Sequence, residues 1–511
     1  MVFKIDQAAL LLRGFSAFRN AGYILICLLS IVLLHVIYVW FFSPLCHIPG
    51  PFLARFTRLW EFWMIAKGDS HQRWVELHEK YGPVVRIAPN LYSFSEVEDM
   101  KAIYSPGNKL PKTTYYNTAG DPERRNIFSM TNADDHALRK RKISNLYTMT
   151  SMINYEPAVD KMNAVLMEKF RQFWRENRTV MIPQFVQYYA FDVIGQITVD
   201  ESFGMMQKEG DAENMLETVK KATLYQNLGG IFPEFHPYFV KVNNLFRVPH
   251  AGVVLERVSR RHLEHHKTHP VVNNDKITHA QPFVTKLLKM ESEGKVDMLD
   301  MIDGIGANIV AGSDTTAITL SAALYYLYRI PNVLSKLRKE IGDLAADGRI
   351  SDPVTFSEAQ NMPYLQAVIM EALRIHPAVG YLLPRRVNKE GLLLAGTYFP
   401  EGTEVGVNAW ALHHNPRFCG PDYQEFKPER WFNQEYQRNL HLASSFAFGA
   451  GSRLCLGKNV SLLELTKVIP QIVRHFDLEF ENPNEGWKLL TTWFVWQDYR
   501  CWIKPRVEAQ A

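Results

Sequence analysis

The chain has 511 residues, of which 47% are hydrophobic and 12% aromatic, so it can bury a large core. Its formal net charge of +4 is too small to indicate a nucleic-acid-binding protein. The five cysteines lack the pairing or spacing of a disulfide framework or a zinc site, and so few thiols suit a reducing compartment.

The first predicted element is a membrane-spanning helix. Residues 22–42 carry no formal charge, and about 21 residues rising about 1.5 Å each reach roughly 31 Å, enough to cross a hydrocarbon core. A cleaved signal peptide would have a shorter apolar region, and the alternative is a buried core helix. The sequence therefore divides into an N-terminal segment (1–21), a transmembrane anchor (22–42), a proline-rich hinge (43–51) and one large domain (52–511). The flanking charges alone do not assign the topology.

Short elements follow the hinge. The pattern predicts a helix over 70–81, a β-hairpin over 83–94 that turns at Pro89-Asn90, and a helix over 96–103. Residues 105–134 are irregular, and a loop of that length is usually functional. The next helix includes His136 and four consecutive cations, 139–142, for which a solvated face is the simplest interpretation.

Long helical patterns fill residues 155–270. By periodicity alone, five aromatic residues in this region are ordinary core: Phe203, Tyr225, Phe232, Phe235 and Tyr238.

Residues 301–328 form a long apolar helical pattern, interrupted by glycines and by the polar run Ser313-Asp314-Thr315-Thr316. Each glycine inside a helix costs roughly 1 kcal/mol relative to alanine. Such a conflict with helix propensity is typical of a functional site. Tight packing against another helix would explain the glycines, but it explains poorly an aspartate beside two threonines.

Three weaker patterns follow. A helix predicted over 362–376 places Glu371 and Arg374 on one face, at i and i+3. Residues 398–407 read as a β-hairpin that turns at Pro400-Glu-Gly402. Residues 491–496 form a bulky aromatic turn.

The most informative stretch is Phe448-x-x-Gly451-x-Arg453-x-Cys455-x-Gly457, which precedes a helical run. Backbone N–H groups of a glycine-rich turn, and the positive end of a helix, can stabilise a thiolate that binds a metal. A lone cysteine is more often a buried small hydrophobe, but the long pattern makes that interpretation the weaker one.

This stretch resembles the haem-thiolate loop of the cytochrome P450 family. Other motifs match the family in the same order along the chain, among them Ala311-Gly-Ser-Asp-Thr-Thr316, Glu371-x-x-Arg374 and Phe426-Lys-Pro-Glu-Arg-Trp431. The resemblance covers about residues 47–505. The sequence of the motifs is most similar to that of microsomal, filamentous-fungal members of the pisatin demethylase type. It implies a mostly α fold, a large helical domain with a smaller β-rich part, behind one transmembrane helix.

The resemblance also implies haem b (iron protoporphyrin IX) as cofactor, with Cys455 as the axial ligand of the iron. Lysine stands at position 140 where the family has arginine, so Arg139 or Arg141 could substitute, and Arg386 is an alternative to Arg385. The implied haem-binding residues are His136, Lys140, Arg385, Phe448, Gly449, Arg453, Cys455 and Gly457.

By the same resemblance, Thr315 and Asp314 are the catalytic residues, the first bonding dioxygen and the second relaying protons. A network of Glu371, Arg374 and Arg430 would hold the cysteine loop without taking part in chemistry. The regions that would approach the substrate are these: Gly304, Ala307, Asn308, residues 379–383, the turn at 491–496, and the aromatics of 155–270 as a roof.

The implied function is a membrane-bound monooxygenase of the endoplasmic reticulum, single-pass, with its catalytic domain facing the cytosol. It would oxidise a small hydrophobic metabolite, such as a terpenoid or polyketide of fungal secondary metabolism. Electrons would come from NADPH-cytochrome P450 reductase, with cytochrome b5 as a second candidate donor, and no nucleic acid is expected as a partner. The alternatives are a haem-thiolate isomerase or dehydratase that does not use O2, and a non-enzymatic haem carrier or sensor.

Overall fold

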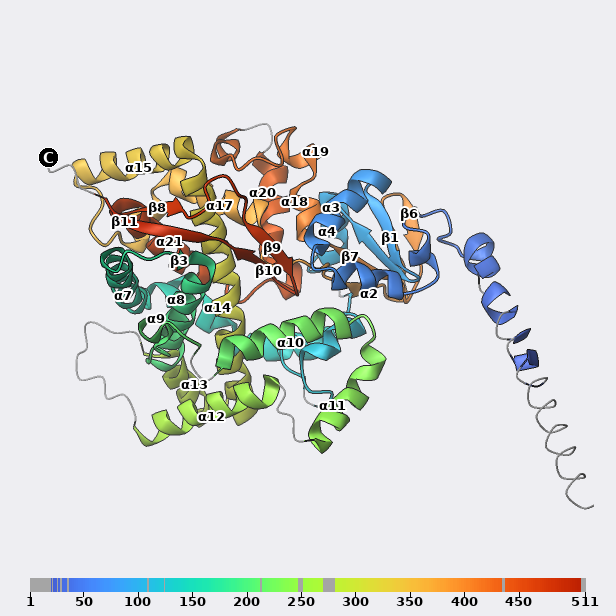
Figure 1. Cartoon of the computed structure of the whole chain (residues 1–511). Coiled ribbons are helices and arrows are strands. Elements are labelled where there is room, and N and C mark those ends of the chain that lie inside the picture. The colour runs from blue at the N-terminus through green and yellow to red at the C-terminus, as the bar shows by residue number, and fades with distance from the viewer. Residues whose placement is uncertain are drawn as a thin grey trace, which may run out of the picture.

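The computed structural model describes residues 20–506, except 21, 25, 28–29, 35, 108–109, 124, 212–213, 247–250, 270–280 and 434–436. Helices predominate in this part of the chain, and the strands form one sheet of four, one of three and two of two. The mostly α fold with a smaller β-rich part is therefore confirmed. Figure 1 shows the four-stranded sheet at the side of the helical body from which the N-terminal segment extends.

The α-helices have these bounds: α2 (Leu59–Ala66), α3 (Ser70–Tyr81), α4 (Val97–Tyr104), α5 (Ala133–Ile143), α6 (Met149–Ile153), α7 (Glu156–Arg175), α8 (Ile182–Val199), α9 (Met205–Lys208), α10 (Met215–Gly229), α11 (His236–Leu245), α12 (Ala251–Thr268), α13 (Phe283–Ser292), α14 (Met298–Arg329), α15 (Pro331–Ala346), α16 (Phe356–Gln360), α17 (Pro363–Ile375), α18 (Ala409–His413), α19 (Pro416–Cys419), α20 (Gln437–Ser445) and α21 (Lys458–His475). Short 3₁₀ turns and one π-turn join them: η1 (Tyr38–Phe42), η2 (Leu53–Arg55), η3 (Thr114–Ala119), η4 (Ser144–Tyr147), η6 (Pro233–Phe235), η7 (Pro428–Phe432), η8 (Phe446–Phe448) and η9 (Gly451–Arg453).

Helix α14 runs through the middle of the helical body (Figure 1). It begins at a capping box, in which the Asp297 carboxylate accepts from the Asp300 N–H at 2.7 Å and the Asp300 carboxylate accepts from the Asp297 N–H at 3.3 Å. It ends at Arg329, because Ile330 precedes Pro331 and leaves the helical region of backbone space. The long helix predicted over 301–328 is confirmed.

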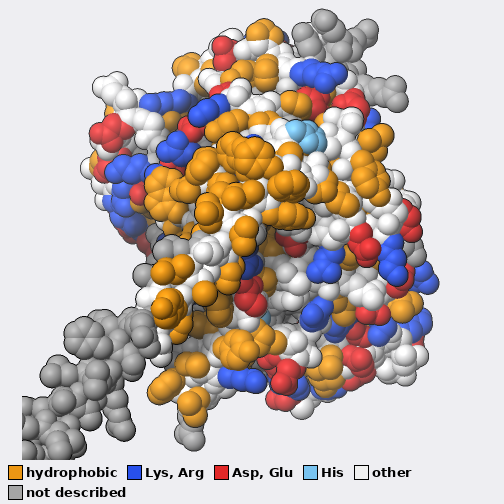
Figure 2. Space-filling view, turned by 90° about the vertical axis from the view of Figure 1, so that its right-hand side faces the viewer, with side chains coloured by type: hydrophobic (Ala, Val, Ile, Leu, Met, Phe, Trp, Pro, Cys, Tyr) orange, Lys and Arg blue, Asp and Glu red, His pale blue; other side chains and the backbone are white. Residues whose placement is uncertain are grey.

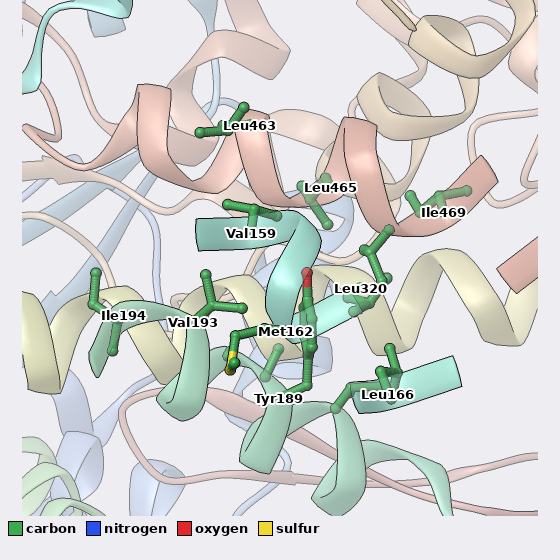
Figure 3. Packing of buried hydrophobic residues seen from close by; sticks show 14 of the residues in the cluster. Val159, Met162, Leu166, Tyr189, Val193, Ile194, Leu320, Leu463, Leu465 and Ile469 are labelled. Carbon is green, nitrogen blue, oxygen red and sulfur yellow. The ribbon is translucent and has the colours of Figure 1, made fainter. Parts of the chain in front are cut away.

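The core is built where α7, α8, α14 and α21 meet. Helix α7 contributes Val159, Met162 and Leu166 from one face, at spacings of three and four residues. Figure 3 shows these side chains beside Tyr189 of α8 and Leu320 of α14. Because all of these side chains are removed from water, α7, α8 and α21 hold α14 rigidly, and α14 carries the candidate catalytic residues.

The four-stranded sheet has the order β1-β2-β7-β4. Strands β1 (Val84–Ala88) and β2 (Leu91–Phe94) form the predicted hairpin, β7 (Glu404–Val407) runs parallel to β2, and β4 (Arg385–Arg386) is antiparallel to β7. The sheet thus combines strands from both ends of the domain, and it places Arg385 beside the loop that contains Lys112.

The hairpin predicted over 398–407 is wrong. Strand β6 (Thr397–Phe399) turns back through Gly396 to pair with β5 (Leu392–Leu394), whereas β7 joins the four-stranded sheet. Gly396 has a φ of 75°, a conformation that glycine adopts without a Cβ clash. Alternation alone could not tell which neighbour each short strand would pair with.

The remaining strands are β3, from the middle of the chain, and β8 to β11, from its C-terminal part. Strand β11 (Arg500–Pro505) pairs with β3 (Val180–Met181) and β8 (Phe476–Phe480), and β9 (Lys488–Thr491) forms a hairpin with β10 (Val495–Asp498). The turn between β9 and β10 holds Trp493 and Phe494, so the predicted aromatic turn is confirmed.

The predicted anchor over 22–42 falls partly outside the described residues. Among those described, no helix is both long enough and apolar enough to span a bilayer. The anchor therefore stays a prediction.

Candidate functional site

The cysteine loop lies between η8 and the start of α21. The Cys455 N–H donates to the Phe448 carbonyl at 2.9 Å, which closes the loop. Burial raises the pKa of the Cys455 thiol, while the N–H groups of Gly457 and Lys458 and the ammonium of Lys140 act in the opposite direction. These donors stand at the N-terminus of α21, where a thiolate that binds a metal would be stabilised.

Lys140 of α5 holds the same loop from outside. Its ammonium donates to the carbonyls of Ser452 at 2.9 Å and Leu454 at 3.2 Å. The structure therefore places this residue on the loop backbone, although its side chain also borders the cavity. The two proposed substitutes differ: Arg139 pairs with Asp300 and Asp303, each at 2.9 Å, and Arg141 is exposed.

Four cationic or basic side chains, Lys112, His136, Arg385 and Arg453, surround one end of the cavity. We call them the cation cluster. Within the described part of the chain, no carboxylate lies within ion-pair distance of any of the four. Burial and the neighbouring cations lower the pKa of His136 to about 3 and the pKa of Lys112 well below its ordinary value. These shifts mean that the protonated forms of the cluster are disfavoured in this buried place unless an anion joins them.

Arg453 gives the clearest sign of a missing partner. Its Nη2 donates to the carbonyls of Thr131 and Asn132, but its buried Nη1 has no hydrogen-bond partner among the described residues. Burial, and then Arg385, lower the pKa of Arg453 to about 10. Arg385 is buried and borders the cavity, whereas Arg386 is exposed. The geometry therefore favours Arg385 over Arg386 as the predicted haem contact.

Lys112 is the member of the cluster that sequence reasoning missed. Its ammonium donates to the Phe128 carbonyl at 2.6 Å and lies 4.1 Å from the ring centroids of both Tyr116 and Phe128. The residue stands alone in an irregular loop, so no spacing pattern marked it. Its position becomes meaningful only through the β-bridge that sets it beside Arg385.

The donor set fits a haem. Two propionates would satisfy the cation cluster and the free Arg453 nitrogen, and the Cys455 thiol opens onto the same cavity for an iron. Phe448 borders the cavity, Gly449 adopts a φ of 72° and Gly457 precedes α21, so all three keep the loop close to that space.

The polar run of α14 contributes Thr315 and Thr316 to the wall of the cavity. The Thr315 hydroxyl donates to the Ala311 carbonyl at 2.8 Å, and the residue borders the cavity. Asp314 is buried and points to the neighbouring α8, where Gln187 donates to its Oδ1 at 2.7 Å. Burial raises the pKa of Asp314 to about 7, and the Gln187 hydrogen bond lowers it in part. A carboxyl with that pKa can take up and give a proton near neutrality.

The structural network forms as predicted. Arg374 makes a bidentate pair with Glu371, at 2.9 Å and 2.7 Å, and the Arg430 Nε donates to the same carboxylate at 2.8 Å. The guanidinium of Arg374 also reaches the carbonyls of Tyr423 and Glu425. All charges are buried and paired, so the network fixes the segment that leads to the cysteine loop.

One continuous cavity of about 1460 Å³ joins these parts. Its lining includes residues from the regions expected to approach the substrate: Gly304, Ala307 and Asn308 of α14, Val379, Tyr381, Leu383, Trp493 and Phe494. The Asn308 side chain is already hydrogen-bonded, because its Oδ1 accepts from the Tyr147 hydroxyl at 2.6 Å. Of the five aromatics assigned to the roof or core, Tyr225 borders the cavity, whereas Phe235 and Tyr238 are exposed at the surface.

Comparison with known proteins agrees with this site. Residues 49–503 match the family model described as cytochrome P450. The chain is 44% identical over 477 residues to pisatin demethylase of Fusarium vanettenii, covering 93% of this chain and 91% of that protein. It is 31% identical over 456 residues to a cytochrome P450 monooxygenase of Aspergillus terreus, covering 85% and 90%. A crystal structure of a cytochrome P450, 20% identical, superposes with a TM-score of 0.74 over 90% of this chain and 98% of that one, which shows the fold. The chain thus belongs to the cytochrome P450 family and is a haem-thiolate monooxygenase of the fungal type.

Proposed function

We propose that this monooxygenase inserts one oxygen atom of O2 into a C–H bond of a small hydrophobic metabolite. The second oxygen atom leaves as water, with two electrons from NADPH and two protons. The observation that carries the proposal is one largely apolar cavity that is lined by both Cys455 and Thr315.

The position of each residue around the cavity suggests its role. Cys455 would bind the haem iron, and the cation cluster would hold the two propionates. When bound, the haem supplies oxygen activation and oxygen-atom transfer. The Thr315 hydroxyl would serve as a proton donor at the cavity wall. Asp314, on the side of α14 that faces Gln187 of α8, would resupply that proton, and the packed α14 would exclude bulk water.

The test is turnover with purified NADPH-cytochrome P450 reductase and a panel of hydrophobic metabolites. We expect product only when NADPH, reductase and O2 are all present, with one label atom incorporated from isotopic O2. The Cys455→Ser variant should lose both product and the thiolate-type spectrum of the reduced carbon monoxide complex. Product formation without NADPH and O2 would instead indicate an isomerase or dehydratase, and haem binding without any product would indicate a carrier or sensor.

We further propose a role in fungal secondary metabolism, on substrates such as terpenoids, polyketides or phenolic ethers. The support is similarity to a relative named for the demethylation of pisatin and to other fungal monooxygenases. Removal of a methyl group from an ether is within the proposed reaction, because oxidation of the methyl carbon gives a product that releases it.

We propose that the enzyme lies on the endoplasmic reticulum membrane, facing the cytosol. Figure 2 shows apolar side chains gathered on the face toward which the N-terminal segment extends in Figure 1. Large exposed apolar side chains occur in or directly beside η1, η2, α2 and α11: Phe41, Phe42, Phe52, Leu53, Leu59, Trp63, Tyr238, Leu245 and Phe246. We call them the apolar face. A patch this large is typical of a membrane or protein interface.

The electron donors would dock on the side of the cysteine loop. Exposed cations occur there on α5, and Lys140 links that helix to the loop backbone. Acidic surfaces of the reductase, or of cytochrome b5, would complement them.

A further inference from the structure

One buried side chain, Tyr147, connects the helix of the cysteine loop to α14. The residue ends η4, is 7% exposed and borders the cavity. Its hydroxyl donates to Asn308 Oδ1 on α14 at 2.6 Å, and its carbonyl accepts from Nδ2 of Asn459, the second residue of α21, at 2.8 Å. A single residue therefore links the helix that follows Cys455 to the helix that carries Thr315.

The Tyr147 hydroxyl is kept in its donor form. Burial, and then the charges of Cys455 and Tyr155, raise the pKa of Tyr147, and the hydrogen bond to Asn308 opposes them only in part. The ring is also held from the side, because Phe283 of α13 packs against it at a centroid separation of 5.2 Å. A neutral, buried phenol needs an acceptor, and the Asn308 oxygen supplies it.

Asn308 is held at both ends of its amide. While Oδ1 accepts from Tyr147, Nδ2 donates to the hydroxyl of Thr198 on α8 at 3.2 Å. Both Asn308 and Thr198 are buried. Because rotation of the amide would break both hydrogen bonds, the amide fixes this turn of α14 between α8 and η4.

The fixed turn lies on the same face of α14 as Thr315. Seven residues separate Asn308 from Thr315, which is about two turns of an α-helix, and both residues border the cavity. Between them stands Gly312, where an added Cβ would lie 3.0 Å from the Ile194 side chain of α8. Glycine weakens a helix at this point, so the position of Thr315 depends on what holds the preceding turn.

We propose that Tyr147 is a positioning residue, which acts through Asn308 to set Thr315 relative to the cysteine loop. The role requires no contact between Tyr147 and the reacting atoms. The proposal rests on the proposed function, since the position of Thr315 matters for the chemistry proposed for this cavity.

The test compares Tyr147→Phe with a matched control, Tyr189→Phe. The control removes the same kind of bond, because the buried Tyr189 hydroxyl of α8 donates to Asn163 Oδ1 of α7 at 2.8 Å. Figure 3 shows Tyr189 among the core side chains of α7, whereas Tyr147 borders the cavity. Both variants lose one buried hydrogen bond, so both should lower the urea midpoint of unfolding.

The readout is the infrared stretching band of carbon monoxide bound to the reduced, haem-loaded full chain. This band responds to the side chains around the bound gas, and its measurement needs no reductase. We expect Tyr147→Phe to shift or split the band and Tyr189→Phe to leave it unchanged. In turnover, Tyr147→Phe should lower kcat by about tenfold with little change in KM, because a displaced group costs rate more than binding.

Asn459→Ala tests the other end of the connection and serves if Tyr147→Phe loads haem poorly. It leaves the Tyr147 hydroxyl and Asn308 in place but removes the bond from α21 to the Tyr147 carbonyl. We expect its band to move in the same direction as in Tyr147→Phe, by a smaller amount. An unchanged band in Tyr147→Phe or in Asn459→Ala, or an equal change in Tyr189→Phe, would overturn the proposal.

The band is measured without turnover, so the two proposals fail separately. Loss of reductase-dependent product with every metabolite would refute the proposed function and leave the comparison of bands intact. An unchanged band in an enzyme that turns over metabolites would refute only the role of Tyr147.

Discussion

At the scale of single residues, Asp314 shows how a neighbour sets a proton affinity. Burial raises its pKa to about 7, and the neutral amide of Gln187 lowers it only in part. A cation in the place of Gln187 would favour the carboxylate far more strongly. The choice of glutamine therefore keeps this carboxyl protonated up to about neutral pH, which suits the proposed role of Asp314 as a proton donor.

Substitutions at Gln187 should move the alkaline limb of activity in opposite directions. As a proton donor Asp314 must be protonated, so the rate should fall as pH rises through about 7. Gln187→Leu removes a hydrogen bond that lowers the pKa of Asp314, and the limb should move to higher pH. Gln187→Lys adds a cation that lowers it further, and the limb should move to lower pH.

The measurement is kcat against pH, together with the amount of product formed per NADPH oxidised. A role for Gln187 in folding alone would lower the rate at every pH without moving the limb. If the alkaline limb moved in the same direction in both variants, Asp314 would not be the group whose protonation controls the rate.

The cation cluster makes a second prediction at this scale. Replacing Lys112 by methionine removes one positive charge from the end of the cavity that fits the propionates, and it should weaken haem retention by about ten- to a hundredfold. The measurement is the rate of haem transfer to an excess of apomyoglobin. Lys112→Arg, which keeps the charge, is the matched control and should stay near the natural rate.

The haem-free protein should respond with the opposite sign. Burial, and then repulsion from Arg385 and Arg453, lower the pKa of Lys112, so the ammonium destabilises the folded apoprotein below its ordinary pKa. Lys112→Met should therefore raise the urea midpoint of the apoprotein while lowering haem affinity. A variant that lost stability in both forms would show that Lys112 acts through packing alone.

At the scale of elements, the cysteine loop depends on how closely it lies against α4. Gly451 has a φ of 64°, and a Cβ built on it would stand 1.9 Å from the Tyr104 carbonyl oxygen. Gly449 has a similar φ of 72°, but a Cβ there would find its nearest atom at 3.6 Å. Substitutions at the two glycines therefore distinguish the effect of backbone strain from the effect of a steric clash.

Gly451→Ala should displace the loop, whereas Gly449→Ala should only strain it. With a φ of 72° and a ψ of −167°, Gly449 lies in a backbone region that is essentially restricted to glycine and costs another residue about 1–3 kcal/mol, so Gly449→Ala should lower the free energy of unfolding by about that amount. Gly451→Ala adds the clash, and we expect a larger loss together with reduced haem loading and a diminished thiolate-type carbon monoxide spectrum. Equal losses in the two variants would mean that the loop can withdraw from α4 freely.

The elements also show where sequence reasoning succeeds. The cysteine loop, the polar run of α14 and the pair on α17 were predictable because each lies in one short contiguous segment with a fixed spacing. Lys112 and Gln187 were not, since each is a single polar residue in a loop or helix and gains its role from a partner far along the chain. The same limit explains the wrong hairpin at 398–407, because pairing partners are chosen by the sheet as a whole.

At the scale of the whole molecule, the apolar face and the cavity lie on connected elements. Arg58, at the start of α2, donates to the Ile231 carbonyl at 2.9 Å, and its guanidinium stands 4.8 Å from the Phe232 ring. Helix α2 is thus fastened to the segment between α10 and α11. Of these, α10 lines the cavity and α11 carries exposed apolar side chains. A membrane that covered the apolar face would bring lipid-dissolved substrate next to the roof of the cavity.

Lipid contact at α11 can be tested at one position. Phe246, just after α11, is 71% exposed, and with the photoreactive amino acid p-benzoylphenylalanine in its place we expect light-dependent cross-links to phospholipid in vesicles that contain the full chain. The control position is Phe432 of η7, which is 49% exposed and lies on an element packed against α17 and α20. Cross-links at both positions would indicate random contact. Absence of lipid adducts at position 246, in protein that stays with the vesicles, would mean that the N-terminal segment alone holds the enzyme and that α11 faces water.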